Sequence, residues 1–351
     1  MTAPPPPRSH DRRIPCLDGI RAVSISCVIF AHAVHASSAG GWFLYAARLG
    51  TLGVHVFFVL SGYLITTLLL QEYEKTNDVS VRGFMWRRIT RILPAYAVYL
   101  MVVWATVPAP PDARWWPALT YTSNVFGTRW WETGHTWSLS VEEQFYLTWP
   151  LIFSLGPRRA GWVALLVFAS SPILRAILFL VTREGALGLS WNHDLIAAGA
   201  LLAIACPRGF AFRWSAAAPI AAVVVAITLS GSTRWLFATN VAIGISVEAI
   251  AIATSLAWCL ARPQSRIGRV LDWRPIRALG IVSYSLYLWQ QLFLHPQAPL
   301  PLWSGVLAAL GAATASYWFV ERPGLSMRRA LPRWYRMLRF NFGRISALEE
   351  S

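Results

Sequence analysis

Long apolar runs alternate with short polar segments along the whole chain. The runs that we interpret as membrane-spanning helices are 17–38, 51–71, 92–107, 137–156, 161–182, 192–206, 216–231, 238–261, 277–295 and 302–320. Because about 20 apolar residues are needed to cross a ~30 Å hydrocarbon core, the runs at 92–107, 192–206 and 216–231 are expected to be tilted or partly re-entrant. The pattern predicts an all-α protein, a polytopic bundle of about ten transmembrane helices.

The composition agrees with a lipid environment. Of the 351 residues, 56% are hydrophobic and only 13% are charged, whereas soluble proteins have about 25% charged residues. This excludes disordered, fibrous and ordinary cytosolic proteins and makes the lipid bilayer a partner. The net charge of +15 would suggest nucleic acid in a soluble protein. Here the charges fall between the apolar runs, so we expect no nucleic-acid partner.

The distribution of Lys and Arg predicts the orientation. With ten spans, 24 of the 31 basic residues fall on the side of the two termini and five on the opposite side. Basic loops stay in the cytoplasm, so both termini are predicted to be cytoplasmic in a multi-pass protein of the inner cell membrane. We divide the chain into a polar Pro/Arg-rich N-terminus (1–16), a transmembrane domain (17–321) and a basic tail (322–351).

No cleaved signal peptide is expected, because no small-residue cleavage site closes the first apolar run. The cysteines are Cys16, Cys27, Cys206 and Cys259. None falls on the predicted external side, so no disulfide is expected. The few His and Cys residues lack the spacing of metal ligands, and no metal site is predicted.

Several ionisable residues interrupt the first span. Arg21 and His32 are eleven residues apart, which places them on one helix face about 16 Å apart along the axis. Asp18 is three residues before Arg21 and could pair with it. One interpretation is structural, with Arg21 extending to the headgroups. The other is a functional row, because ionisable groups inside spans are costly.

Further polar groups mark the second, third and fourth spans. Arg88 and Arg91 share a helix face just before the third span and could grip phosphates or anchor lipid headgroups. Ser138, Glu142 and Tyr146 share one face of the fourth span, and the adjacent acids Glu142 and Glu143 lie near its external end. His55 lies at the external mouth of the second span. Elsewhere, Arg175 could pair with Glu248, and Gln290 and Gln291 could line a cavity.

Four sequence blocks resemble the integral-membrane acyltransferases of the acyltransferase-3 type. They are LDGIRAVSISCVIFAHAVH, LGVHVFFVLSGYLITTLL, FMWRRITRILPAY and TWSLSVEEQFYLTWPL, with SYSLYLW and VERP as supporting blocks. Arg21 and His32 have the family's Arg-then-His spacing, and Arg88 and Arg91 match its paired arginines. The resemblance runs from about residue 15 to 323.

The resemblance implies transfer of an acyl group from cytoplasmic acyl-CoA to a hydroxyl of a glycan or glycosylated small molecule. Acetyl-CoA is the default donor substrate, and no bound cofactor is implied. His32 would be the general base, since imidazole has a reference pKa near 6.5, and Glu142 could orient it. Arg88 and Arg91 would hold the CoA phosphates, and Arg21 would meet the donor at the inner mouth.

The residues expected to contact substrate are His55, Trp137, Ser138 and Tyr146. The chain departs from the family's pattern at Gln290, where members often have His, and at Asn192, where they often have Arg two residues before Asp194. Some relatives carry a C-terminal hydrolase-like extracellular domain. This chain ends about thirty residues after its last predicted span, so we expect transfer to be completed within the membrane domain.

Two other functions fit the same polar residues. A transporter or flippase of acyl groups or lipid-linked sugars would need the polar path but no general base and no grip on CoA. A non-catalytic membrane scaffold would tolerate replacement of His32. The residues that distinguish these hypotheses are His32 and the Arg88–Arg91 pair.

Overall fold

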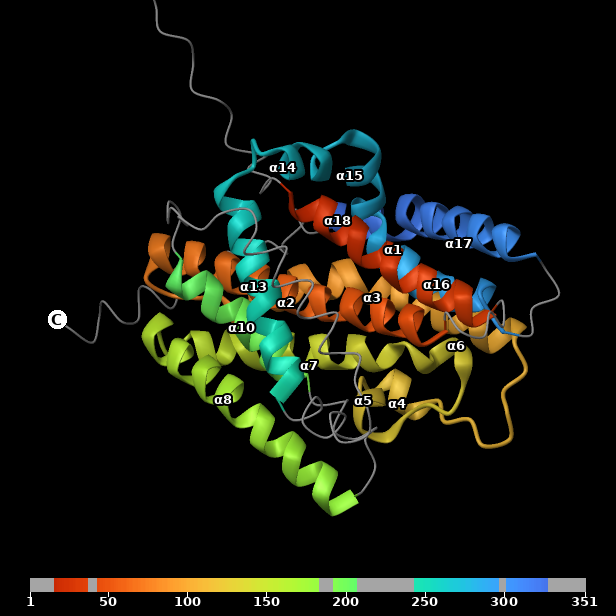
Figure 1. The fold of residues 1–351 in the computed structure, drawn as a ribbon, viewed down its shortest axis with the longest axis horizontal. Coiled ribbons are helices and arrows are strands. Elements are labelled where there is room, and N and C mark those ends of the chain that lie inside the picture. The colour runs from red at the N-terminus through yellow and green to blue at the C-terminus, as the bar shows by residue number, and fades with distance from the viewer. Residues whose placement is uncertain (1–15, 37–42, 183–191, 207–242, 297–300, 328–351) are drawn as a thin grey trace, which may run out of the picture.

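The computed structural model describes residues 16–36, 43–182, 192–206, 243–296 and 301–327, and within these ranges every regular element is helical. The helices up to residue 182 are α1 (Leu17–Ala36), α2 (Phe43–Thr76), α3 (Val81–Thr106), α4 (Trp116–Leu119), α5 (Ser123–Phe126), α6 (Trp131–Gly134), α7 (Thr136–Phe153) and α8 (Pro157–Thr182). The later ones are α10 (His193–Ala205), α13 (Ile245–Ala261), α14 (Arg266–Leu271), α15 (Arg274–Ile281), α16 (Ser283–Phe293), α17 (Leu302–Ser316), a π-helical turn (Tyr317–Glu321) and α18 (Arg322–Met327). The prediction of an all-α protein is confirmed for the described residues (Figure 1).

The long helices support a membrane protein. Five of the described helical segments are long and apolar enough to cross a bilayer: α1, α2, α3, α8 and the continuous segment from α17 to α18. The predicted spans 192–206 and 238–261 form the shorter helices α10 and α13. The predicted span 216–231 lies outside the described residues. The count of ten spans and the cytoplasmic termini therefore stay predictions.

Two span boundaries were wrong. The third helix begins at Val81 rather than near residue 92, because the Ser80 hydroxyl caps it by accepting from the Gly83 N–H at 3.2 Å. Arginine side chains interrupt the apolar pattern there without interrupting the helix. The predicted span 277–295 is two helices, α15 and α16, separated at Val282.

Helix α2 lies at the centre of the bundle and packs against α1 on one side and α10 on another. At the crossing with α10, a Cβ on Gly62 would lie 2.0 Å from the Ile196 carbonyl oxygen, and a Cβ on Gly199 would lie 2.0 Å from the Val59 carbonyl oxygen. No side chain fits at either place, so the two backbones touch.

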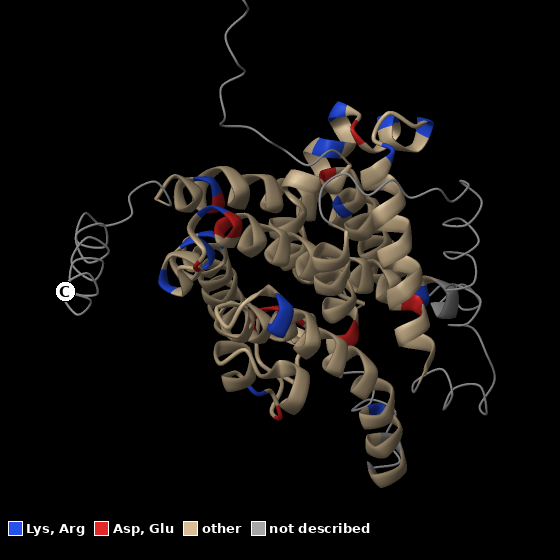
Figure 2. Ribbon diagram, turned by 90° about the vertical axis from the view of Figure 1, so that its left-hand side faces the viewer, with Lys and Arg blue, Asp and Glu red and all other residues tan. Residues whose placement is uncertain are grey.

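The outer surface of the long helices is apolar. Phe319 is 80% exposed, Val181 76% and Trp104 73%, as expected for side chains that face lipid. Four arginines lie instead on the short helices α14 and α15, which are at the top of the molecule in Figures 1 and 2; they are Arg266, Arg269, Arg274 and Arg277.

A fully buried ion pair connects α8, α10 and α13. Arg175 donates through both terminal nitrogens to the two carboxylate oxygens of Asp194, each at 2.9 Å, and also to the Ser246 hydroxyl at 2.7 Å. The predicted pairing of Arg175 with Glu248 is wrong. Glu248 instead lies against His55 of α2, with 3.1 Å between Oε1 and Nδ1.

The topology can be tested with single cysteines. Cys16 is buried and is a poor labelling target, whereas Lys75, at the end of α2, and Asp112, in the α3–α4 connection, are exposed. In a variant without the four native cysteines, Lys75→Cys is expected to react with impermeant maleimide only in opened cells, and Asp112→Cys in intact cells. The reverse pattern would invert the predicted orientation.

Candidate functional site: two adjoining cavities

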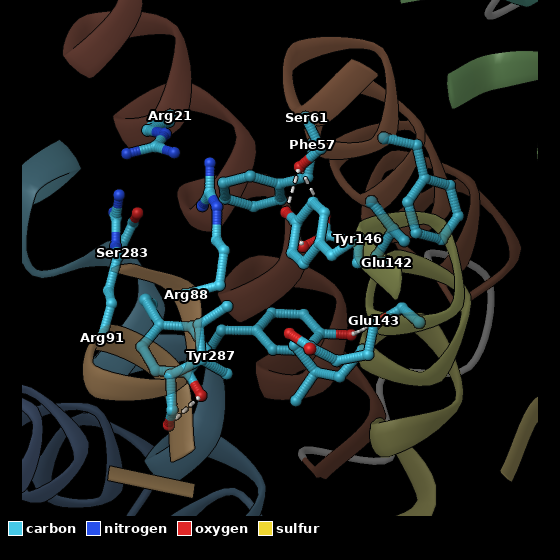
Figure 3. A pocket seen from close by; sticks show the side chains of 16 residues that line it. Arg21, Phe57, Ser61, Arg88, Arg91, Glu142, Glu143, Tyr146, Ser283 and Tyr287 are labelled. Atoms are coloured by element: carbon cyan, nitrogen blue, oxygen red, sulfur yellow. Dashed lines mark hydrogen bonds between the residues drawn. The ribbon is translucent and has the colours of Figure 1, made fainter. Parts of the chain in front are cut away.

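The first cavity, which we call the arginine cavity, lies between α1, α2, α3, α7 and α16. Its lining residues are Arg21, Val54, Phe57, Phe58, Ser61, Arg88, Arg91, Ile92, Ser138, Leu139, Glu142, Glu143, Tyr146, Ser283, Tyr284 and Tyr287. In Figure 3 the three arginines lie on one side, and Ser61, Glu142 and Tyr146 lie on the other. The arginines and the Glu142 carboxylate thus line opposite sides of the arginine cavity.

The three arginines have no direct ion pair with any residue that the structure describes. Within the described residues, no carboxylate lies at ion-pair distance from Arg21, Arg88 or Arg91, and the pairing of Arg21 with Asp18 considered from the sequence is not formed. The Arg88 guanidinium lies over the Tyr146 ring at 4.8 Å from its centroid, a cation–π contact that orients it without cancelling its charge. Three guanidiniums facing one cavity favour a multiply charged anion.

The opposite side is a closed hydrogen-bond group. The Ser61 hydroxyl donates to Oε1 of Glu142 at 2.9 Å, and the Tyr146 hydroxyl donates to Oε2 at 3.0 Å. Glu142 and Tyr146 come together because they are one helical turn apart on α7, while Ser61 comes from α2. The carboxylate is therefore held by two hydroxyls at the wall of the arginine cavity.

The second cavity, which we call the histidine cavity, contains His32. Its lining residues are Val28, Ala31, His32, His35, Ala47, Gly50, Thr51, Val54, Trp131, Gly134, His135, Trp137, Tyr287 and Gln291. Trp131 is stacked on His35 with 5.1 Å between ring centroids and meets His32 edge to face at 5.7 Å. Its indole N–H donates to the backbone carbonyl of Gln291 at 3.0 Å.

The two cavities adjoin, because Val54 and Tyr287 line both. The Tyr287 hydroxyl lies 2.6 Å from the Ser138 hydroxyl and 3.2 Å from the His135 carbonyl oxygen. Helix α16 supplies lining to both, since Ser283, Tyr287 and Gln291 follow one another at four-residue spacing and so share a face. A molecule that reached from one cavity to the other would pass this hydroxyl pair.

The structure separates residues that the sequence analysis grouped. Arg21 and His32 lie on α1 in different cavities. Glu142 lines the arginine cavity and is absent from the lining of the cavity that contains His32. It is satisfied by Ser61 and Tyr146, so the idea that it orients His32 is not supported by any contact.

The four expected substrate contacts also divide. Ser138 and Tyr146 line the arginine cavity, and Trp137 lines the histidine cavity. His55 lines neither, because it is buried against Glu248. The paired arginines Arg88 and Arg91 lie together as expected, one turn apart within α3.

Sequence reasoning missed Tyr287, Trp131 and His135. The signal for Tyr287 was present, because it is four residues before Gln291, a residue already noted as polar within an apolar run. No comparable pattern marked His135, whose neighbours come from α3 and α16. Among the described residues, no group of His, Cys, Asp or Glu side chains is arranged to hold a metal ion.

Comparison with known proteins identifies the family to which the chain belongs. The profile described as "Acyltransferase domain" matches residues 14–321. Curated relatives include YrhL of Bacillus subtilis, provisionally named a peptidoglycan O-acetyltransferase, which is 28% identical over 90% of this chain and 55% of its own length. The peptidoglycan O-acetyltransferase OatA of Listeria monocytogenes is 26% identical over 90% of this chain and 56% of its length. The O-acetyltransferase OatA of Staphylococcus aureus is 27% identical over 89% and 57%.

The chain thus spans about half the length of the curated relatives it matches. No solved structure matches it. The family profile, in contrast, covers most of the 351 residues, including every residue that lines the two cavities. The chain therefore belongs to the acyltransferase domain family.

Proposed function

We propose that this chain is a membrane O-acyltransferase that moves an acetyl group from acetyl-CoA to a hydroxyl of a glycan or glycosylated small molecule. The observation that carries the proposal is the pair of adjoining cavities, one lined by three arginines without ion-pair partners among the described residues and the other by His32. A phosphate-bearing donor suits the first cavity, and a hydroxyl acceptor beside a general base suits the second.

In this proposal the donor enters from the cytoplasm and its phosphates bind Arg88, Arg91 and Arg21. The pantetheine arm then extends past Tyr287 towards His32. Arg21 and His32 are separated by about 16 Å along α1, which an extended arm of this kind can cover. The inner cell membrane is the expected location, with the arginine cavity nearer the cytoplasm.

The transfer step needs one base. His32 takes the proton of the acceptor hydroxyl as its oxygen attacks the thioester carbonyl carbon. A carbon–oxygen bond forms, the carbon–sulfur bond breaks, and the leaving thiolate of CoA takes the proton that His32 accepted. The products are an O-acetyl ester and free CoA.

The acceptor class rests on the relatives and on the aromatic lining. The relatives are named for O-acetylation, two of them with peptidoglycan as the substrate. In the histidine cavity, Trp131 and Trp137 contribute indole rings to the same lining as His32. Aromatic rings pack well against sugar rings, and hydroxyls of a bound sugar would then lie near the imidazole.

The direct test uses membranes with and without the protein, acetyl-CoA labelled on the acetyl group, and glycan and metabolite fractions from the host. The proposal expects alkali-labile label in an acceptor fraction together with release of free CoA. A flippase would show transport without CoA release. Absence of both label and CoA release across all acceptor fractions would contradict the proposal.

Removing one arginine of the pair is expected to weaken donor binding. Arg88→Ala or Arg91→Ala should each raise KM for acetyl-CoA about 10- to 100-fold with a smaller change in kcat, because a charge-assisted contact contributes about 1.5–3 kcal/mol. The matched control is Arg87→Ala in the same helical turn. Arg87 binds Glu72 at 3.0 Å and is absent from the cavity lining. Equal KM values for the Arg88 and Arg87 variants would favour a lipid-anchoring role instead.

A further inference from the structure

The Gln291 side chain lies between two imidazoles. It is 5% exposed and reaches from α16 to His135, at the start of α7, and to His32 on α1. Its Oε1 accepts from the His135 backbone N–H at 3.0 Å and also contacts Nδ1 of the same residue. Its Nε2 lies 3.5 Å from Nε2 of His32. One amide thus joins the proposed base to a second helix.

The backbone fixes which way this amide points. A backbone N–H can only donate a hydrogen bond, so the group of Gln291 that faces it must be the carbonyl oxygen. The NH2 group must then face His32. Because an amide NH2 can only donate, the His32 nitrogen that it faces must present a lone pair.

This orientation sets the tautomer of His32. A neutral imidazole carries its hydrogen on one nitrogen and a lone pair on the other. With the lone pair on Nε2, the hydrogen is on Nδ1. The Gln290 side chain lies beside the same imidazole and is fully buried. Its amide atoms make no hydrogen bond of normal geometry with the described residues, so its oxygen is available to Nδ1–H.

The distance between Gln291 Nε2 and His32 Nε2 leaves the His32 nitrogen able to accept a proton. A separation of 3.5 Å is long for a hydrogen bond between nitrogens, so Gln291 orients the lone pair without saturating it. A hydroxyl oxygen placed beside both nitrogens could accept from the Gln291 NH2 and donate its own hydrogen to His32 Nε2. That is the arrangement a general base needs before proton transfer.

We propose that Gln291 is the positioning residue that holds His32 with Nε2 unprotonated, so that Nε2 is the atom that takes the acceptor's proton. This role, expected of Glu142 from the sequence, falls to an amide on α16. The catalytic role of Nε2 in this inference rests on the proposed function. The tautomer itself can be observed without any substrate.

The spectroscopic test uses protein labelled with 15N at histidine, with the His32 signals assigned by their loss in His32→Gln. In the wild-type protein we expect a proton on Nδ1 and none on Nε2. In Gln291→Glu, the oxygen of the ionised carboxylate that replaces the NH2 group can only accept, so the proton is expected on Nε2. A wild-type proton on Nε2, or an unchanged pattern in Gln291→Glu, would overturn the proposal.

Two further variants guard against misfolding. Gln291→Met keeps an unbranched side chain of similar length and removes the donor, so His32 is expected to lose its single tautomer. The matched control is Gln144→Met, which removes another amide, one that binds Asn124 and the Tyr121 carbonyl and lines neither cavity. It should leave the His32 signals unchanged. A shift as large as that of Gln291→Met would show that the effect is general.

The kinetic test separates this inference from the proposed function. Gln291→Glu is expected to lower kcat for acetyl transfer by about 100-fold or more. The KM for acetyl-CoA is expected to change by less than about threefold. Wild-type kcat in a variant whose tautomer is reversed would exclude Nε2 as the base. If the wild-type protein transfers no acetyl group, the proposed function fails, while the spectra still decide the tautomer.

Discussion

Changing His32 to alanine is expected to lower kcat for acetyl transfer by about 10²- to 10⁴-fold, the usual contribution of a general base. The reason is the position of His32 in the cavity that adjoins the arginine cavity. Without a base, the acceptor hydroxyl must lose its proton to water or attack while protonated. KM for acetyl-CoA should change little, because the arginines that are proposed to bind it lie on the far side of Tyr287.

Kinetics and stability must be measured on the same preparations. The His32→Ala protein should keep the wild-type unfolding temperature in detergent, since the contact of His32 with Gln291 is long, at 3.5 Å. A useful comparison is His35→Ala, three residues further along α1, which removes a ring that stacks on Trp131. Its loss of kcat should be much smaller. Equal losses for both variants would indicate a disturbed cavity and would argue against His32 as the base.

Changing Asp194 to alanine is expected to cost about 3–5 kcal/mol of stability. Both Arg175 and Asp194 have side chains with no exposed surface, and they are joined by two contacts of 2.9 Å. Removal of the carboxylate takes both of these contacts from a guanidinium in the protein interior, while its contact with the Ser246 hydroxyl remains. Breaking a buried pair is costly chiefly because the remaining charge is not compensated.

The measurement is the unfolding temperature of purified protein in detergent, with recovery of folded protein as a second readout. The control is the double variant Arg175→Met/Asp194→Leu, which removes both charges and keeps apolar volume. It should recover much of the lost stability, because no lone charge remains buried. A single Asp194→Ala variant as stable as wild type would show that the pair contributes little to holding α8, α10 and α13 together.

The local features of the site could be predicted from the sequence. Helical periodicity placed Ser138, Glu142 and Tyr146 on one face, and all three line the arginine cavity. The same reasoning placed Arg88 beside Arg91. These predictions hold because contacts one turn apart depend only on the 3.6-residue repeat. The all-α fold also followed from the apolar runs, since a lipid-exposed chain must satisfy its backbone within each helix.

Polar residues that interrupt an apolar run were harder to interpret. Arginines in the first turns of α3 lowered its apolar character, so its start was placed about three turns late. The Asn192 departure from the family pattern has a counterpart in space, because Arg175 of α8 supplies a guanidinium to Asp194. A motif read along the chain could not reveal a partner supplied by another helix.

The tertiary structure alone decided which polar groups face one another. Ser61 holds Glu142 across 81 residues of sequence, and Gln291 lies beside His32 across 259. His55 lies against Glu248, and Arg175 binds Asp194 instead. A buried charge or amide must find a partner, but the sequence does not say which, because that choice depends on how helices distant in the chain cross. Periodicity fixes the face that a side chain occupies on its own helix, and packing fixes what that face meets.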